Sequence, residues 1–152
     1  MKILVTGATG FLGRHLVKEL SKNFEVYYSN TKQANLFEYE KFCEYFAKHK
    51  FEYIYHLAAK TKAGDYCLTH KGDQWIDNQL INTNILKYWV EKQPQAKMVC
   101  MGTSCMYQPS EFPLEEINCL KGDPDPGLKT YAFTKRMLLL DARKRASKKN
   151  GA

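Results

Sequence analysis

With 152 residues, of which 44% are hydrophobic and 26% charged, the chain can bury one hydrophobic core, and its composition excludes a disordered protein. No apolar run approaches the roughly 20 residues that span a bilayer. The run in the N-terminal MKILVTG is too short for a secretory signal, so we expect a cytoplasmic protein with no membrane partner. The formal charge of +7 comes almost entirely from the segment that begins at Lys135. We interpret this segment as a solvated helix face rather than a phosphate-contacting patch and expect no nucleic-acid partner, because the chain has no zinc-finger, helix-turn-helix or RNA-binding signature.

Short apolar, β-branched runs alternate with amphipathic stretches of helical length, and this alternation predicts an α/β fold with a doubly wound parallel sheet. The predicted strands are Lys2 to Thr6, Glu25 to Ser29, Tyr53 to Leu57 and Lys97 to Met101. The predicted helices are Phe11 to Ser21, Phe37 to His49, Gln74 to Lys92 and a last one that begins near Tyr131. Before this last helix, the proline-rich segment from Gln108 to Lys129 is typical of a long ordered loop.

The usual arrangement of such a Rossmann-like sheet predicts that its four strands lie in the order 3-2-1-4, with right-handed crossovers. Folds of this type usually add two more strands, and no residues remain here to form them, so the sheet is predicted to be truncated after the last helix. The fourth strand is then an uncovered apolar edge, which natural proteins avoid. We expect either that another chain pairs with it, as in a homo-oligomer, or that the sequence is a fragment of a longer protein.

The first predicted strand runs directly into the loop TGATGFLG and then into a helix. Glycines with this spacing suit a tight turn, a close approach of the backbone to a diphosphate, and close packing of helix on strand. The N-terminus of the helix adds N–H donors and a partial positive charge. The loop therefore predicts a dinucleotide site, formed by Gly7, Thr9, Gly10, Phe11, Leu12 and Gly13.

The end of the second strand distinguishes the two nicotinamide dinucleotides, because a carboxylate there binds the ribose hydroxyls of NAD. At this point the sequence has Asn30 and Lys32 but no acid. A lysine can pair with a 2′-phosphate, so these two residues favour NADP(H). NAD(H) stays open as the alternative, because Lys32 is equally well explained as a surface lysine in a turn.

Tyr131 and Lys135 are four residues apart, so they share one face of a helix. A phenol ordinarily has a pKa of about 10, and we expect the ammonium of Lys135 to lower the pKa of Tyr131 while it also holds the cofactor's ribose. Thr103 follows the fourth strand, where ligands of open α/β sheets bind, and is placed to hydrogen-bond a substrate oxygen. These three residues predict a proton-transfer site.

The cysteines are five in number, and they follow neither a CxxC pair nor a cysteine–histidine zinc spacing. A chain without an export signal ordinarily keeps its thiols reduced. We therefore expect free thiols and no metal site.

The GxxGxxG loop, together with Thr103, Tyr131 and Lys135, resembles the extended branch of the short-chain dehydrogenase/reductase superfamily, which comprises NAD-dependent epimerases and dehydratases. The runs GTSCMY, PLEEINCLKGDPDP and YAFTK resemble more specifically the GDP-L-fucose synthase family. Five residues before Tyr131 fall in register with that family without a gap: Pro113, Glu116, Leu120, Gly122 and Pro126. Two earlier segments agree with it as well, HLAAK after the third strand and Asn35-Leu36 before the second helix, so the resemblance covers essentially the whole chain.

This resemblance implies an NADP(H)-dependent nucleotide-sugar epimerase/reductase, which epimerises a GDP-4-keto-6-deoxyhexose at C3 and C5 and reduces it at C4. It implies that Cys105 is the acid/base of the epimerisation, that Tyr131 protonates the C4 oxygen, and that Asn78 supports the site. The further cofactor contacts that it implies are Asn35, Leu36, Leu57, Ala58, Ala59, Tyr131 and Lys135. The family's histidine acid and most of its sugar contacts lie after the YxxxK helix. Residues 1–152 are therefore expected to be the NAD(P)-binding domain, with a C-terminal substrate domain absent from this chain.

Two other interpretations stay open. One is another nucleotide-sugar epimerase or dehydratase of the extended branch, although dehydratases usually carry an Asp-Glu pair where Ser104-Cys105 stand here. The other is a catalytically silent, truncated dinucleotide-binding module, whose edge strand and basic tail bind a partner.

Overall fold

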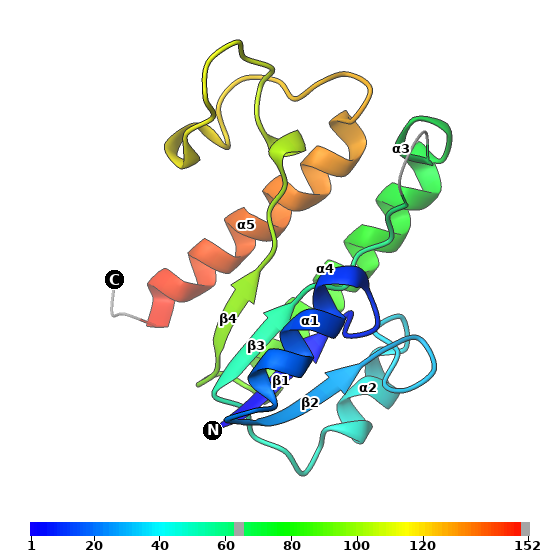
Figure 1. Cartoon of the computed structure of the whole chain (residues 1–152), viewed down its shortest axis with the longest axis vertical. Coiled ribbons are helices and arrows are strands. Elements are labelled where there is room, and N and C mark those ends of the chain that lie inside the picture. Colours follow the sequence, from blue (N-terminus) through cyan, green and yellow to red (C-terminus); the bar gives the residue numbers. More distant parts are fainter. Residues whose placement is uncertain (63–65, 150–152) are drawn as a thin grey trace. The chain divides into compact units, whose positions relative to one another are not determined.

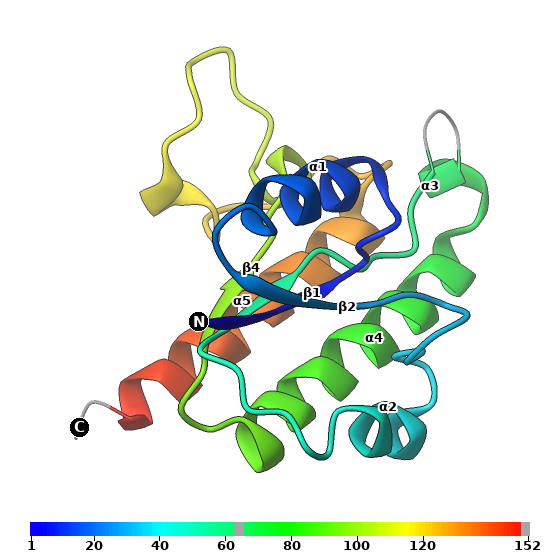
Figure 2. The same ribbon diagram turned by 60° about the horizontal axis from the view of Figure 1, so that its bottom comes forward.

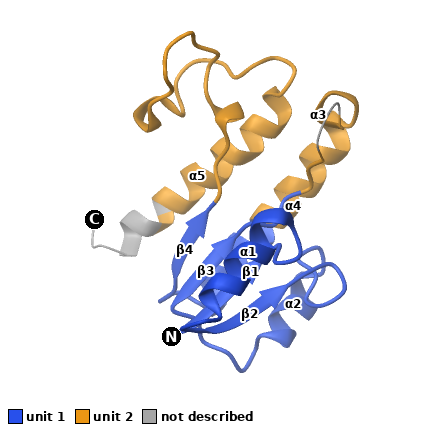
Figure 3. Cartoon of the chain, viewed as in Figure 1, with its two compact units in different colours: residues 1–59, 83–100 blue, residues 60–82, 101–152 orange. Residues whose placement is uncertain are grey.

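Four parallel strands form the sheet of this protein, whose structure is a computed structural model that describes residues 1–62 and 66–149 (Figure 1). The strands are β1 (Lys2–Thr6), β2 (Glu25–Ser29), β3 (Tyr53–His56) and β4 (Lys97–Cys100). The helices are α1 (Phe11–Leu20), α2 (Tyr39–Tyr45), α3 (Tyr66–Thr69), α4 (Lys71–Lys92) and α5 (Lys129–Lys149), with the short 3-10 helices η1 (Ser104–Met106) and η2 (Glu116–Asn118). The chain divides into unit 1, residues Met1–Ala59 and Thr83–Cys100, and unit 2, residues Lys60–Asn82 and Met101–Ala152 (Figure 3).

The sheet lies in unit 1, and its strand order is β2-β1-β3-β4 with all neighbours parallel. A four-stranded parallel sheet is confirmed, but the predicted order 3-2-1-4 is wrong, because β3 pairs with β1 and not with β2. The side chains explain this order: β3 completely buries Ile54 and His56, whereas β2 leaves Glu25 and Tyr28 exposed and so suits an edge. A hydrogen bond of 2.8 Å between Thr6 Oγ1 and His56 Nδ1 also joins the ends of β1 and β3.

Helices cover both faces of the sheet within unit 1 (Figure 2). On one face, Ile3 and Val5 of β1 pack against a row of apolar side chains on α1: Leu16, Val17 and Leu20. On the other face, the rings of Phe42 on α2 and Tyr88 on α4 pack edge to face, with their centres 5.0 Å apart. Full burial of a side chain such as Ile3 or Val5 contributes about 1.5–3 kcal/mol, so these contacts fix the central strand between two helical layers.

The helices near the second strand and the third differ from the sequence expectation. The predicted helix Phe37 to His49 is shorter in the structure, where α2 spans Tyr39–Tyr45. Its later start follows from a turn at Asn35, whose Oδ1 accepts the N–H of Phe37 at 3.1 Å. The four-residue helix α3 was not predicted at all, since one helical turn is too short to show a period.

Unit 2 contains α3, the N-terminal half of α4, η1, η2 and α5. Inside this unit η1 contacts α5, and Asn82 Nδ2 donates to the carbonyl oxygen of Thr134 at 3.3 Å, which ties α4 to α5. The segment between η1 and α5 is irregular apart from η2, as the sequence predicts for a proline-rich loop. None of the helices in the described ranges is long and apolar enough to cross a membrane.

Candidate active site

The glycine loop between β1 and α1 brings three backbone segments of unit 1 too close together for side chains. Gly7 has a φ of +68°, and a Cβ there would lie 2.7 Å from the backbone nitrogen of Ala58. A Cβ on Gly13 would lie 2.3 Å from the carbonyl oxygen of Gly7. Gly10 precedes α1, and its N–H donates to the Gly7 carbonyl oxygen at 3.0 Å, which closes the turn. The structure thus gives a physical reason for glycine at positions 7 and 13.

The start of α1 is open to ligands. Phe11 and Leu12 are 78% and 46% exposed, and Thr9 is exposed beside them. The first N–H groups of a helix have no partner within the helix and carry its partial positive charge. These residues can therefore donate backbone hydrogen bonds to a diphosphate.

The end of β2 forms a tight turn. Asn30 Oδ1 accepts the backbone N–H groups of Lys32 and Gln33 at 2.8 and 2.9 Å, so the carboxamide of Asn30 shapes the turn. Lys32 is exposed at the end of this turn, where its ammonium is free to reach an anion in solvent. Further on, Leu36 is buried, and its carbonyl oxygen accepts from Asn84 Nδ2 at 2.7 Å. This bond fixes the segment that carries Asn35 and Leu36.

The residues after β3 lie next to the glycine loop within unit 1. The N–H of Ala58 donates to Thr6 Oγ1 at 3.3 Å, and the N–H of Leu57 donates to the Thr6 carbonyl oxygen at 3.3 Å. Ala58 is also the residue whose backbone excludes a Cβ at Gly7. Leu57, Ala58 and Gly7 therefore lie close together, and Ala59 follows directly in the chain.

The predicted catalytic residues all lie in unit 2. Thr103 caps η1, and its Oγ1 accepts the backbone N–H of Cys105 at 3.3 Å. Tyr131 and Lys135 lie on α5, which η1 contacts. The Lys135 ammonium lies 5.9 Å from the centre of the Tyr131 ring, and the side chain of Lys135 is 3% exposed. The sequence spacing thus correctly predicts that the phenol and the ammonium share a helix face.

The pKa of Tyr131 differs from the expectation. Burial, and to a smaller extent the neighbouring thiols Cys105 and Cys67, raise this pKa from its ordinary value of 10.0 to about 12. The predicted lowering of the Tyr131 pKa by Lys135 is therefore wrong for the protein without cofactor, because the cost of removing the phenolate from water dominates. The phenol keeps its proton at neutral pH, which suits a proton donor better than a base.

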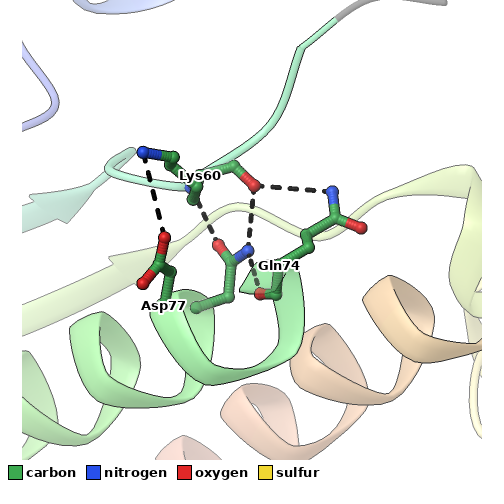
Figure 4. A network of polar contacts seen from close by, with 4 residues as sticks. Lys60, Gln74 and Asp77 are labelled. Atoms are coloured by element: carbon green, nitrogen blue, oxygen red, sulfur yellow. Dashed lines mark hydrogen bonds and ion pairs between the residues drawn. The ribbon is translucent and has the colours of Figure 1, made fainter. Parts of the chain in front are cut away.

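A buried amide network holds the N-terminal half of α4 to Lys60 (Figure 4). Asn78 accepts from the Lys60 N–H at 2.9 Å and donates to the Lys60 carbonyl oxygen at 2.9 Å and to the Gln74 carbonyl oxygen at 2.7 Å. Gln74 Nε2 donates to the sulfur of Cys67 at 3.1 Å. The side chains of Lys60 and Asp77 form a long ion pair of 3.8 Å across the network. Asn78 thus supports the backbone around Lys60.

Two residues of unit 2 were missed at the level of sequence. Cys67 interacts electrostatically with Tyr131, but nothing in its sequence context marks it, because α3 is a single turn. Arg136 is 7% exposed, and a buried charged residue needs partners, which the sequence does not show.

A hollow of about 380 Å³ in unit 2 lies elsewhere, in the irregular segment after η1. Its lining includes the side chains of Gln108, Glu115 and Lys121. None of the residues predicted to bind cofactor or substrate lines it. In the described part of the chain, no group of three or more histidine, cysteine or acidic side chains is arranged to hold a metal ion.

Comparison with known proteins identifies relatives over nearly the whole chain. Residues 3–151 match the model of the "NAD dependent epimerase/dehydratase family". The chain is 29% identical over 141 residues to a probable GDP-L-fucose synthase of Drosophila melanogaster and 29% identical over 140 residues to a GDP-L-fucose synthase of Dictyostelium discoideum. Each alignment covers 90% of this chain and 44% of the relative. The chain therefore spans less than half the length of the curated relatives that it matches.

Solved structures show a similarity to the same kind of protein. A GDP-L-fucose synthetase from Naegleria fowleri is 28% identical, with a TM-score of 0.81 over 97% of this chain and 44% of that one. The same protein bound to NADP gives a TM-score of 0.80 at the same identity and coverage. The predicted fold class and the predicted family resemblance are both confirmed.

Proposed function

The chain belongs to the NAD dependent epimerase/dehydratase family, and we propose that it is the cofactor-binding part of an NADP(H)-dependent nucleotide-sugar epimerase/reductase. The proposed substrate is a GDP-4-keto-6-deoxyhexose, epimerised at C3 and C5 and reduced at C4. The observation that carries the proposal is the cluster in unit 2, where α5 carries Tyr131 and Lys135 and packs on the helix η1 that carries Cys105. The names of the relatives, and the NADP in one of the solved structures, support the choice of substrate and cofactor.

The glycine loop fits a dinucleotide, because Gly7 and Gly13 let the backbone of the loop pack closely on Ala58 and on the start of α1, so that bare backbone precedes the open end of this helix. We assign Thr9, Gly10 and the first N–H groups of α1 to the diphosphate, and Lys32 to the 2′-phosphate. Asn30, Asn35, Leu36, Leu57, Ala58 and Ala59 complete the proposed cofactor site. Bound NADPH supplies the hydride for reduction at C4.

The proposed chemistry uses the protonation states that the structure favours. Tyr131 is protonated at neutral pH, since its pKa of about 12 lies far above 7, and it donates this proton to the C4 oxygen as that oxygen gains charge. Lys135 lies beside the phenol and stabilises the negative charge left on it. Thr103 donates a hydrogen bond to the same substrate oxygen. Cys105 removes and returns protons at the carbons next to the C4 ketone, a task that suits a thiol because its ordinary pKa is close to neutral.

The test is turnover by the natural full-length protein. With NADPH and GDP-4-keto-6-deoxymannose we expect consumption of NADPH, followed by its absorbance, and inversion at C3 and C5, followed by NMR of the product. The Cys105→Ser variant is expected to lose solvent deuterium uptake at C3 and C5 but to keep reduction. Failure of the wild-type protein to consume NADPH with any of several 4-keto nucleotide sugars would reject the reductase function, and equal deuterium uptake in the variant would remove Cys105 from the mechanism.

We also propose that the protein is a cytoplasmic homo-oligomer. All five cysteines are free, which suits a reducing compartment. Unit 2 exposes apolar side chains on two of its helices: Trp75, Ile76 and Leu80 on α4, and Met137 and Leu140 on α5. Exposed apolar stripes of this kind are typical of interfaces between copies. The mass in solution by light scattering tests this proposal, and a monomer at all concentrations would contradict it.

A further inference from the structure

Arg136 is a buried cation in unit 2, where its planar guanidinium joins three backbone segments. Its Nε donates to the carbonyl oxygen of Met106 at 2.7 Å. Its Nη1 donates to the carbonyl oxygen of Gly122 at 2.8 Å, and its Nη2 to that of Lys121 at 3.0 Å. A guanidinium presents its donors in a rigid fork, so these bonds set the positions of their acceptors relative to α5.

One arm of the fork holds η1. Met106 is the last residue of η1 and is 3% exposed. Hydrogen bonds within residues 103–107 run from Cys105 to Thr103, from Met106 to Thr103 and from Tyr107 to Ser104. The bond from Arg136 to the Met106 carbonyl oxygen links this segment, and with it η1, to α5.

The other two arms hold the far end of the irregular segment that follows η1. Gly122 has a φ of +58°, and a Cβ there would collide with the side chain of Gln108, so this turn is closely packed against the beginning of the segment. The Arg136 guanidinium thus holds the end of the segment from Gln108 to Gly122 on α5, and it keeps η1 on the same helix. All of these residues lie in unit 2.

We propose that Arg136 is a positioning residue, which holds η1 on α5 so that Thr103 and Cys105 stay beside the phenol of Tyr131. Arg136 touches no reacting atom itself, and it acts through the Met106 carbonyl oxygen. This inference rests on the proposed function for its catalytic consequence. The structural part of the inference, that Arg136 anchors η1 on α5, does not depend on turnover.

The experiment measures the accessibility of the Cys105 thiol. Arg136→Lys keeps the charge but loses the fork, and Arg136→Gln loses both. Arg143→Lys and Arg143→Gln are the matched controls, because Arg143 is exposed on the same helix. Each variant of the 152-residue chain is treated with iodoacetamide, and alkylation of each cysteine is followed by peptide mass spectrometry, with Cys43 on α2 as the internal reference.

We expect alkylation of Cys105 to be about fivefold faster or more in both Arg136 variants, because η1 opens locally from α5. Cys43 and both Arg143 variants should keep wild-type rates, and the dissociation constant for NADPH should change by less than about twofold. In the natural full-length protein, the kcat of Arg136→Lys should fall by about ten- to a hundredfold while the KM for NADPH is kept, since small displacements of catalytic groups have effects of this size.

Two results would overturn the proposal. One is wild-type alkylation of Cys105 in both Arg136 variants. The other is global unfolding of Arg136→Lys, seen by circular dichroism, when Arg143→Lys stays folded, because Arg136 would then support the whole fold and not η1 alone. If the wild-type protein consumes no NADPH, the proposed function fails, but the alkylation rates still decide the role of Arg136.

Discussion

Gly13 provides the sharpest test of the glycine loop, because its neighbours are backbone atoms that cannot rotate away. A Cβ at this position would lie 2.3 Å from the Gly7 carbonyl oxygen and 2.7 Å from the Ala8 Cα. We therefore predict that Gly13→Ala destabilises the protein and pushes the start of α1 away from the loop. Gly72 is a matched control, since it also lies in the first turn of a helix, but a Cβ there would meet nothing within 4 Å.

The expected size of the effect follows from two opposing contributions. Replacing glycine by alanine in a helix favours folding by up to about 1 kcal/mol, whereas overpacking costs typically about 1–3 kcal/mol. The backbone contacts of Gly13 place it at the upper end of that range, so the net loss is about 2 kcal/mol. For a chain of this length, such a loss lowers the melting temperature by about 4–8 °C. Gly72→Ala should leave the melting temperature unchanged or slightly raised.

Thermal unfolding by circular dichroism and calorimetric titration with NADPH measure the two consequences. We expect Gly13→Ala to bind NADPH at least about tenfold more weakly, because the N–H donors at the start of α1 move away from the diphosphate. Gly72→Ala should bind as the wild type does. An unchanged melting temperature together with unchanged NADPH affinity in Gly13→Ala would refute the argument that close packing at this glycine forms the cofactor cradle.

Three further perturbations test other parts of the site. The pKa of Tyr131 is raised from 10.0 to about 12, so the stability that this group contributes is present below pH 10 and is lost as the pH rises towards 12. Between pH 10 and pH 12, the free energy of unfolding of the wild type, measured by urea titration, should therefore fall by about 1–2 kcal/mol relative to that of Tyr131→Phe. This figure is reduced because the phenol is partly exposed. Parallel curves of stability against pH for the two proteins would contradict the prediction. Asn78→Ala removes two hydrogen bonds to Lys60 of 2.9 Å and one to the Gln74 carbonyl oxygen of 2.7 Å, and it should cost about 2–3 kcal/mol in the same assay. The neighbouring Gln79→Ala should cost less than about 0.5 kcal/mol, and equal losses in the two variants would argue against the network. Lys32→Glu should weaken binding of NADPH about tenfold or more without weakening that of NADH, and equal losses for both dinucleotides in calorimetry would remove Lys32 from cofactor selection.

Local patterns in the sequence were sufficient for much of the fold. The strands β1 and β2 have their predicted bounds, and β3 and β4 end one residue earlier than predicted. The glycine loop was located from its place between an apolar strand and an amphipathic helix, because the geometry it needs involves residues close in sequence. The pairing of Tyr131 with Lys135 was predictable for the same reason, since helix periodicity alone puts them on one face.

The tertiary structure decided what depends on contacts between residues far apart in the chain. The strand order follows burial, because β3 completely buries Ile54 and His56 whereas β2 leaves Glu25 and Tyr28 exposed. The bonds between Lys60 and Asn78 and the bonds of the Arg136 fork join residues 14 to 30 apart in sequence. The pKa of Tyr131 also depends on residues far apart in the chain. The sequence shows the lysine that favours the phenolate, but only the fold shows the burial and the two thiols that oppose it. Periodicity and spacing report local geometry, whereas desolvation is a property of everything that packs around a group.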